Sequence, residues 1–191
     1  MYRMKKIFEI RLHGRGGQGA KTASQFIAEA AMDKGKHIQA FPEYGPERAG
    51  APMKAYTRIS DSEIKGVSPV INPDVVIVID PTLLSPKVAE GLHEGSILLA
   101  NTDKDINYVR EKTGFKGKIG VVDATKIAID AVGKNLPNTP MIGALIKATG
   151  IITIDSIDSK IKEKFLKKIG DEKTKATMDA VKKAHDEVKI E

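Results

Sequence analysis

Residues 74–80 constrain the fold more than any other part of the sequence. They have the sequence DVVIVID, in which nearly every residue between the two acids is apolar and β-branched. Such a run is typical of a strand buried on both faces, like the central strands of a parallel sheet. Apolar runs at residues 96–100 and 118–123 indicate two more core strands. Because helices cover both faces of a parallel sheet, we expect an α/β protein.

Helical patterns alternate with the strand patterns. Apolar residues recur at helical spacing in five stretches, which are residues 20–32, 125–132, 140–149, 156–169 and 173–188. A short helix is expected at 85–92, and further strands at residues 5–13, 37–41 and 53–60. We predict a three-layer α/β/α fold with a mostly parallel or mixed sheet of about six strands. The two C-terminal helices are expected to form a lid or an appendage.

The chain has the size of one domain. It has 191 residues and no shift in composition, so we expect residues 1–191 to form a single domain. It has no cysteine, which excludes disulfides and cysteine-bound zinc or iron–sulfur clusters, and its four histidines are scattered. No apolar stretch approaches the ~20 residues of a membrane span. The first residues, MYRMKK, lack the apolar region of a secretion signal, so we expect a cytoplasmic protein without membrane contact.

The net charge of +6 is concentrated in the first third of the chain. Residues 1–60 contain 11 Lys and Arg against 5 Asp and Glu, whereas the rest is nearly balanced. These cations are dispersed and few aromatic residues accompany them, so no nucleic-acid partner is predicted. An anionic small ligand or an acidic partner surface fits the charge equally well.

A glycine-rich loop separates the first expected strand from the first expected helix. Residues 13–22 read HGRGGQGAKT, with glycine at positions 14, 16, 17 and 19. Glycines let the backbone approach a ligand closely, and the N-terminus of the following helix attracts phosphate or carboxylate. The alternative is that these glycines only form a tight turn and let the helix pack closely on the sheet.

Two familiar phosphate-binding patterns match this loop incompletely. Gly14, Gly16 and Gly19 have the spacing of the dinucleotide fingerprint, and Glu43 lies at about the right distance to hold a ribose, but it follows Pro42 in an expected loop. The P-loop pattern fails by one position because Ala20 separates Gly19 from Lys21. Asp80 is the one candidate we find for holding magnesium, so a nucleotide hydrolase is disfavoured.

Two further segments have unusual composition. Residues 42–52 contain three prolines and two glycines, together with Glu43, Tyr44 and Arg48, and we expect a long loop with a functional or contact role. Residues 138–145, NTPMIGAL, open a helix of small residues, which suits either internal packing or an interface. We find no complete set of catalytic residues, so the chain is expected to be a subunit rather than a complete enzyme.

Together, three segments in this order resemble the gamma subunit of 2-oxoacid:ferredoxin oxidoreductases, and the pyruvate enzymes most of all. They are the strand–GxGGQG–helix opening, the EYGPER segment at residues 43–48 and the NTPMIGAL segment. The resemblance implies oxidative decarboxylation of a 2-oxoacid, with acyl transfer to coenzyme A and electrons passed to ferredoxin through the complex. It places thiamine pyrophosphate and iron–sulfur clusters on the alpha, beta and delta partner subunits, so this chain alone binds no cofactor.

The resemblance also implies which residues form the site. The matching positions are Gly14, Gly16, Gly17, Gln18 and Gly19 in the first segment and Glu43, Tyr44, Gly45, Pro46 and Arg48 in the second. With Arg15, the glycine loop is expected to hold coenzyme A or to face thiamine, and Arg48 to pair with an anion. Two alternatives remain: a stand-alone Rossmann-type NAD- or flavin-binding oxidoreductase, and an interaction module without a ligand.

Overall fold

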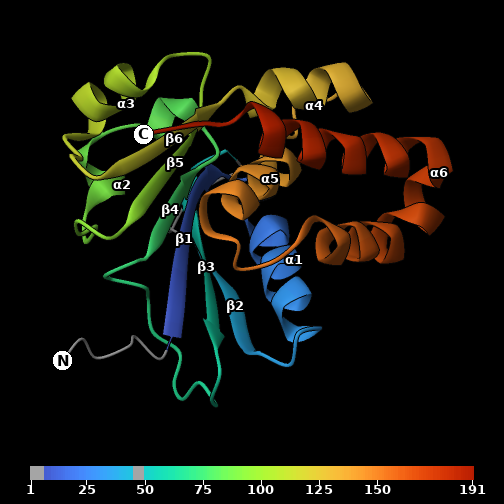
Figure 1. The fold of residues 1–191 in the computed structure, drawn as a ribbon, viewed down its shortest axis with the longest axis horizontal. Coiled ribbons are helices and arrows are strands. Elements are labelled where there is room, and N and C mark those ends of the chain that lie inside the picture. The colour runs from blue at the N-terminus through green and yellow to red at the C-terminus, as the bar shows by residue number, and fades with distance from the viewer. Residues whose placement is uncertain (1–6, 45–49) are drawn as a thin grey trace.

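All strands belong to one seven-stranded sheet. Figure 1 shows the chain as a computed structural model, which describes residues 7–44 and 50–191 and, of Tyr44, only the backbone. The strand order is β2-β3-β1-β4-β5-β6-β7. The strands are β1 (Ile7–Arg15), β2 (His37–Tyr44), β3 (Pro52–Ser60), β4 (Val75–Val78), β5 (Ile97–Asn101), β6 (Lys118–Val122) and β7 (Lys189–Ile190).

The sheet is mixed. Strands β1, β4, β5 and β6 run parallel to one another, whereas β3 is antiparallel to both of its neighbours, β1 and β2. β7 adds an antiparallel edge beside β6. The predicted mixed α/β sheet is therefore confirmed, with one strand more than expected, because the two residues of β7 are too few to give a periodic pattern.

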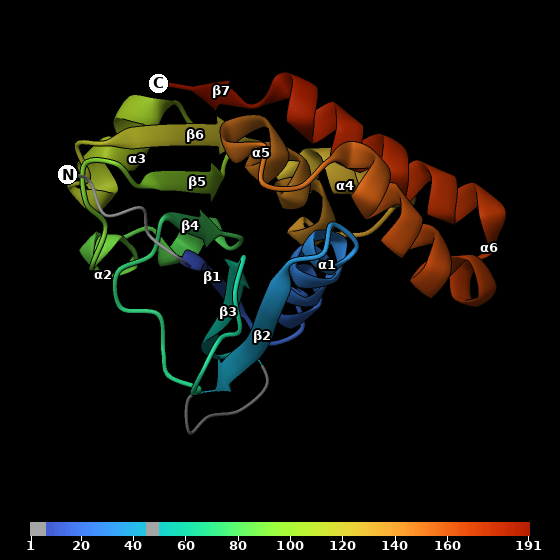
Figure 2. The same ribbon diagram turned by 60° about the horizontal axis from the view of Figure 1, so that its bottom comes forward.

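Helices cover both faces of the sheet (Figures 1 and 2). One layer contains α1 (Ala20–Met32), α4 (Ala124–Val132), α5 (Asn138–Thr149) and α6 (Ile154–Glu187). The other contains a 3-10 turn at Pro81–Leu83, α2 (Pro86–Ala89) and α3 (Ile106–Thr113), and it packs on β4, β5 and β6. No described helix is long and apolar enough to cross a membrane.

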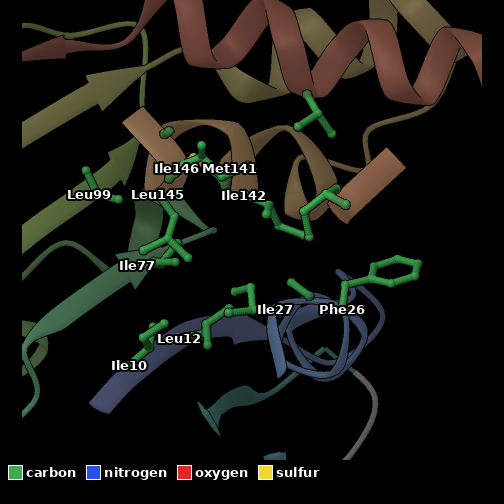
Figure 3. Packing of buried hydrophobic residues seen from close by; sticks show 14 of the residues in the cluster. Ile10, Leu12, Phe26, Ile27, Ile77, Leu99, Met141, Ile142, Leu145 and Ile146 are labelled. Atoms are coloured by element: carbon green, nitrogen blue, oxygen red, sulfur yellow. The ribbon is translucent and has the colours of Figure 1, made fainter. Parts of the chain in front are cut away.

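The larger core lies between the sheet and the layer formed by α1 and α5. Figure 3 shows Leu12 of β1, Ile77 of β4 and Leu99 of β5 pointing toward Ile27 of α1 and Leu145 of α5, and all five are at most 1% exposed. α5 is buried over its whole first part, Asn138–Ile146. Such complete burial explains why its sequence shows only a weak amphipathic pattern.

α5 and α6 are in backbone contact. A methyl group on Gly143 of α5 would lie 2.0 Å from the carbonyl oxygen of Val181 in α6, so only glycine fits there. The small residues of α5 therefore serve packing within the chain, one of the two interpretations that the sequence allowed.

The C-terminal helices are part of the main helical layer rather than a lid or an appendage. α6 consists of two helical halves that meet at Gly170, whose φ of 80° and ψ of 170° break the helix. Ile157 and Ile161 of the first half and Val181 and Ala184 of the second are completely buried. The sequence predicted both helices, but their amphipathic pattern does not reveal that they pack against α5.

The two ends of the segment 42–52 lie in strands rather than in a loop. β2 continues to Tyr44, and β3 begins at Pro52, so Pro42 and Glu43 lie in a strand. Pro42 is tolerated because β2 is an edge strand, where a missing amide donor disrupts no ladder on the outer side. Gly45, Pro46, Glu47, Arg48 and Ala49 lie outside the described residues.

Gly143→Ala tests the contact between α5 and α6. The new methyl group cannot be accommodated beside Val181, so we expect a loss of about 1–3 kcal/mol of unfolding free energy, measured by urea denaturation. Lys147→Ala on the exposed side of the same helix is the control and should change the value by less than about 0.5 kcal/mol. Equal effects of the two substitutions would contradict the packing described.

Candidate functional site

The glycine loop lies where the strand order reverses. The chain leaves β1 through α1 toward β2 on one side of the sheet, whereas β4 leads to β5 on the other side. The amide of Ile79 donates to the carbonyl of His13, so the ends of β1 and β4 lie side by side. In open α/β sheets, ligands bind outside the carboxyl ends of the strands at such a point.

The loop presents backbone to its surroundings at two adjoining places. Gly17 has a φ of 92°, and a side chain built on it would meet nothing within 4 Å. Gly19 is the N-cap residue of α1, and no side chain caps this helix. The first amides of α1 are thus not taken by a capping side chain, and this end of the helix carries a partial positive charge. The arrangement suits an anionic group.

Two loop glycines are required by close packing instead. The amide of Gly16 donates to the carbonyl of Ala51 at 3.0 Å, and a Cβ on Gly16 would lie 3.1 Å from the nitrogen of Gly50. A Cβ on Gly19 would lie 2.5 Å from the amide nitrogen of Asn138, which donates to the carbonyl of Gly19. Close packing therefore accounts for Gly16 and Gly19, whereas no packing contact requires a glycine at position 17.

A buried carboxylate holds the loop in place. Asp80, which follows β4 and is 6% exposed, accepts from Gln18 Nε2 at 2.6 Å and from the amide and hydroxyl of Thr82 at 2.9 and 2.6 Å. Arg15 Nε lies 3.2 Å from the same carboxylate. Gln18 Oε1 in turn accepts from the amide of Arg15 at 2.8 Å. The side chain of Gln18 thus joins the end of β4 to the end of β1.

These contacts keep Asp80 ionised. Burial by itself raises the pKa of the carboxyl, but the hydrogen bonds from Thr82 and Gln18 and the charge of Arg15 outweigh burial, so the pKa lies below its ordinary value of 3.8. At neutral pH the carboxylate therefore neutralises Arg15 beneath the loop.

The expected site residues divide into two groups. Gly14, Arg15, Gly16, Gly17, Gln18 and Gly19 lie together in the loop, but the side chains of Arg15 and Gln18 are engaged within the protein. Glu43 lies two strands away at the end of β2, where it accepts from the hydroxyl of Tyr56 and lies 4.0 Å from Lys54 Nζ. The side chain of Tyr44 and all of Arg48 lie outside the described part of the chain.

The glycine loop forms one wall of a groove of ≈ 370 Å³. Gly17, Gly19 and Thr22 line it at one end, and its other walls come from α4, α5, α6 and the segment before α5. Leu136 and Ile169 are 40% and 41% exposed there, so the groove combines apolar walls with the uncapped helix end. The sequence did not predict this groove because its walls come from segments that are far apart in the chain. Among the described residues there is no cluster of His, Asp and Glu that could hold a metal ion.

The fold and the loop define an α/β protein with a mixed sheet and an uncapped helix N-terminus at the end of its first strand. The chain belongs to the pyruvate ferredoxin/flavodoxin oxidoreductase family, which matches residues 9–187. It is 57% identical to the pyruvate synthase subunit PorC of Thermotoga maritima over 97% of this chain and 96% of that protein. It is 46% identical to the pyruvate/ketoisovalerate oxidoreductases common subunit gamma of Thermococcus litoralis, over 93% of this chain and 97% of that one.

The likeness extends to three dimensions. The crystal structure of the pyruvate oxidoreductase subunit PORC (EC 1.2.7.1) of Thermotoga maritima matches with a TM-score of 0.90 and 54% identity. The match covers 97% of this chain and 99% of that one. The resemblance drawn from the three sequence segments is therefore confirmed.

Asp80→Asn tests the role of the buried carboxylate. The amide keeps the shape but loses the charge beside Arg15, and its NH2 group places a donor against a donor of Gln18 or Thr82. We expect unfolding free energy to fall by about 1–3 kcal/mol at pH 7 in urea denaturation. Asp103→Asn is the control, because this acid is exposed and contacts only the neighbouring Lys104, and it should change the value by less than about 0.5 kcal/mol.

Wild type and Asp80→Asn can also be compared as a function of pH. Because the pKa of Asp80 is lowered on folding, its stabilisation is complete above the unfolded value of 3.8 and is lost as the pH falls through the folded value. The difference in unfolding free energy between wild type and Asp80→Asn should therefore become smaller below about pH 4. A difference that stays constant into strong acid would argue against an ionised Asp80.

Proposed function

We propose that the chain is the gamma subunit of a multi-subunit pyruvate:ferredoxin oxidoreductase, a pyruvate synthase. This enzyme decarboxylates pyruvate oxidatively, transfers the acetyl group to coenzyme A and passes two electrons to ferredoxin. The identity with a named pyruvate synthase subunit over nearly the full length of both chains carries the proposal. It takes residues 1–191 as one domain, in keeping with a sheet that includes both β1 and the C-terminal β7. A cytoplasmic location stays a prediction.

The proposal assigns the chemistry to the partner subunits. Iron–sulfur clusters are held by cysteine thiolates, and this chain has no cysteine, so the clusters must be held elsewhere in the complex. We assign thiamine pyrophosphate likewise to the alpha, beta or delta chains, and ferredoxin to the assembled complex rather than to this subunit.

We propose that the glycine loop binds coenzyme A at a subunit interface. The uncapped α1 N-terminus and the open backbone at Gly17 supply donors and positive potential for a phosphate group. The adjoining groove offers apolar walls for the uncharged arm of the same molecule. In this proposal Arg15 and Gln18 position the loop through Asp80. A contribution of Glu43, Tyr44 and Arg48 to binding stays a prediction.

The dinucleotide alternative is disfavoured by the position of β3. In a Rossmann fold the acid that holds the ribose ends the strand next to β1. Here β3 lies between β1 and β2, so Glu43 ends a strand about 10 Å from β1. Its carboxylate is also engaged by Tyr56 and Lys54. The glycine spacing therefore occurs without the second half of the fingerprint.

Reconstitution tests the subunit assignment. We expect pyruvate- and coenzyme A-dependent reduction of a viologen dye by the partner subunits under anaerobic conditions to require this chain. Omitting the chain, or replacing it with heat-denatured chain, provides the control. Unchanged rates without it, together with no binding to the partners, would contradict the proposed function.

Lys21→Glu in the reconstituted complex tests the coenzyme A site separately. Lys21 is an exposed residue in the first turn of α1, where an acid is tolerated by the helix but repels an anionic ligand. We expect the KM for coenzyme A to rise about three- to tenfold and the KM for pyruvate to stay unchanged.

The matched control is Lys34→Glu, which makes the same change in charge on an exposed residue just beyond the other end of α1. It should leave both KM values unchanged. Equal effects of the two variants would indicate long-range electrostatics rather than binding at the loop.

A further inference from the structure

A second recess opens on the face of the sheet that α1 does not cover. This recess, the His13 cavity, has a volume of ≈ 350 Å³, which is within the range of small-molecule sites. It is lined by His13, Glu43, Pro52, Met53, Lys54, Leu83, Ser85, Lys87, Val88 and Glu90. His13 alternates along β1 with Leu12, which packs toward α1, so the His13 side chain belongs to the opposite face.

The ring of His13 is fixed in one tautomer. It is 6% exposed, and Arg11 Nε donates to its Nε2 at 3.0 Å. Arg11 is itself held by the carbonyls of Val70, Val88 and Glu90, so it cannot turn away. Because a guanidinium only donates, Nε2 is the acceptor and Nδ1 carries the proton of the neutral ring.

No described residue accepts a hydrogen bond from Nδ1, and Nδ1 is not among the completely buried polar atoms, so its proton is accessible from the cavity. The surroundings also keep the ring neutral: burial, followed by the charges of Arg11 and Lys54, lowers the pKa of His13 to about 3. The contributions of Arg11 and Lys54 indicate a positive potential at the ring. A donor in a positive potential attracts an anionic acceptor.

The other charged groups define how much negative charge the cavity accepts. Lys87 forms no ion pair within the described residues, and Lys54 lies 4.0 Å from Glu43 Oε1. Glu43 is already engaged by Lys54 and the Tyr56 hydroxyl. Glu90 adds a second carboxylate at an exposed position. Two acids beside two lysines and the buried Arg11 leave room for one negative charge but not for several.

We propose that the His13 cavity binds a single carboxylate group, which accepts a hydrogen bond from His13 Nδ1 and pairs with Lys87. Leu83 and Val88 provide apolar contact for the attached carbon atoms. The carboxylate belongs either to a free small acid or to an acidic residue of a partner chain. The site lies on the other face of the sheet from the groove beside α1 and does not depend on the proposed role of the glycine loop.

The test is a titration of the ¹⁵N-labelled full chain with sodium acetate, followed by NMR and compared with sodium chloride at equal ionic strength. We expect a saturable shift of the His13 Nδ1 resonance and of amides around the cavity. Inorganic phosphate at the same pH should bind at least about tenfold more weakly than acetate, because its additional charge meets Glu43 and Glu90. Equal or tighter phosphate binding would overturn the carboxylate assignment.

Two substitutions of His13 separate ligand binding from structure. Glutamine places an acceptor near the position of Nε2 and keeps the contact with Arg11, but it removes the donor at Nδ1. Asparagine places a donor near the position of Nδ1 and removes the acceptor for Arg11. We expect His13→Gln to fold normally and to bind acetate about tenfold more weakly, and His13→Asn to retain more of the binding despite lower stability.

Lys87→Ala is an independent variant at an exposed position and should weaken acetate binding about threefold or more, whereas Lys126→Ala, an exposed lysine on α4, should not. Binding that is the same in His13→Gln, Lys87→Ala and wild type would overturn the proposal. In the assembled complex, persistent acetate binding identifies a free acid as the ligand. Acetate binding lost on assembly, together with weaker assembly of His13→Gln, identifies a partner's carboxylate.

Discussion

The carboxylate of Asp80 is the interaction on which the site depends. It lies at the end of β4, yet three of its contacts fix residues of other segments: Gln18 and Arg15 in the loop after β1, and Thr82 in the turn that follows. Without it, the Nε2 group of Gln18 and the amide of Thr82 would lose their acceptor, and leaving a partly buried donor unpaired costs about 1–3 kcal/mol. These contacts hold both ends of the segment from Arg15 to Gln18, which contains Gly17.

The elements of the core were predictable because their patterns are local. The apolar run at 74–80 predicted β4, and the helical spacing after residue 20 predicted α1 within its observed bounds. The order of the strands was not predictable in this way. Nothing in residues 52–60 indicates that β3 inserts between β1 and β2, because insertion depends on contacts with both strands rather than on the pattern of either. The same limit explains why the two halves of α6 were expected to lie apart from the core.

The candidate site was likewise predictable only in part. The glycine spacing and the helix that follows it indicated an anion-accepting loop, and residues 14–19 do lie together. The sequence did not show that the Gln18 and Arg15 side chains face inward to Asp80, because a polar side chain on a loop is equally compatible with ligand contact. Nor did it show that Glu43 lies at the end of β2, which is separated from β1 by β3 in the sheet. Both facts depend on which segments meet, which a single sequence does not specify.

Three arginines among the first sixty residues bind groups within the protein rather than a ligand. Arg11 and Arg58 are 5% and 6% exposed, and their guanidinium groups bind carbonyls, Glu9 and Gln39 rather than a ligand. Arg15 is engaged by Asp80. These arginines serve the fold, whereas Lys21 is exposed near the uncapped helix end and Lys54 lines the cavity beside His13.

The antiparallel insertion of β3 explains why such charged residues can lie inside. Parallel strands need a helix on each face, whereas an antiparallel part of a sheet can do without one. On the face away from α1, the guanidinium groups of Arg11 and Arg58 donate to the carbonyls of Ser68 and Val70 in irregular chain and of Val88 in the short helix α2. The His13 cavity adjoins these segments, because Val88 lines it as well. β1 therefore contributes to both faces of the sheet. Its end leads into the glycine loop beside α1, and the side chain of His13 lines the cavity on the opposite face.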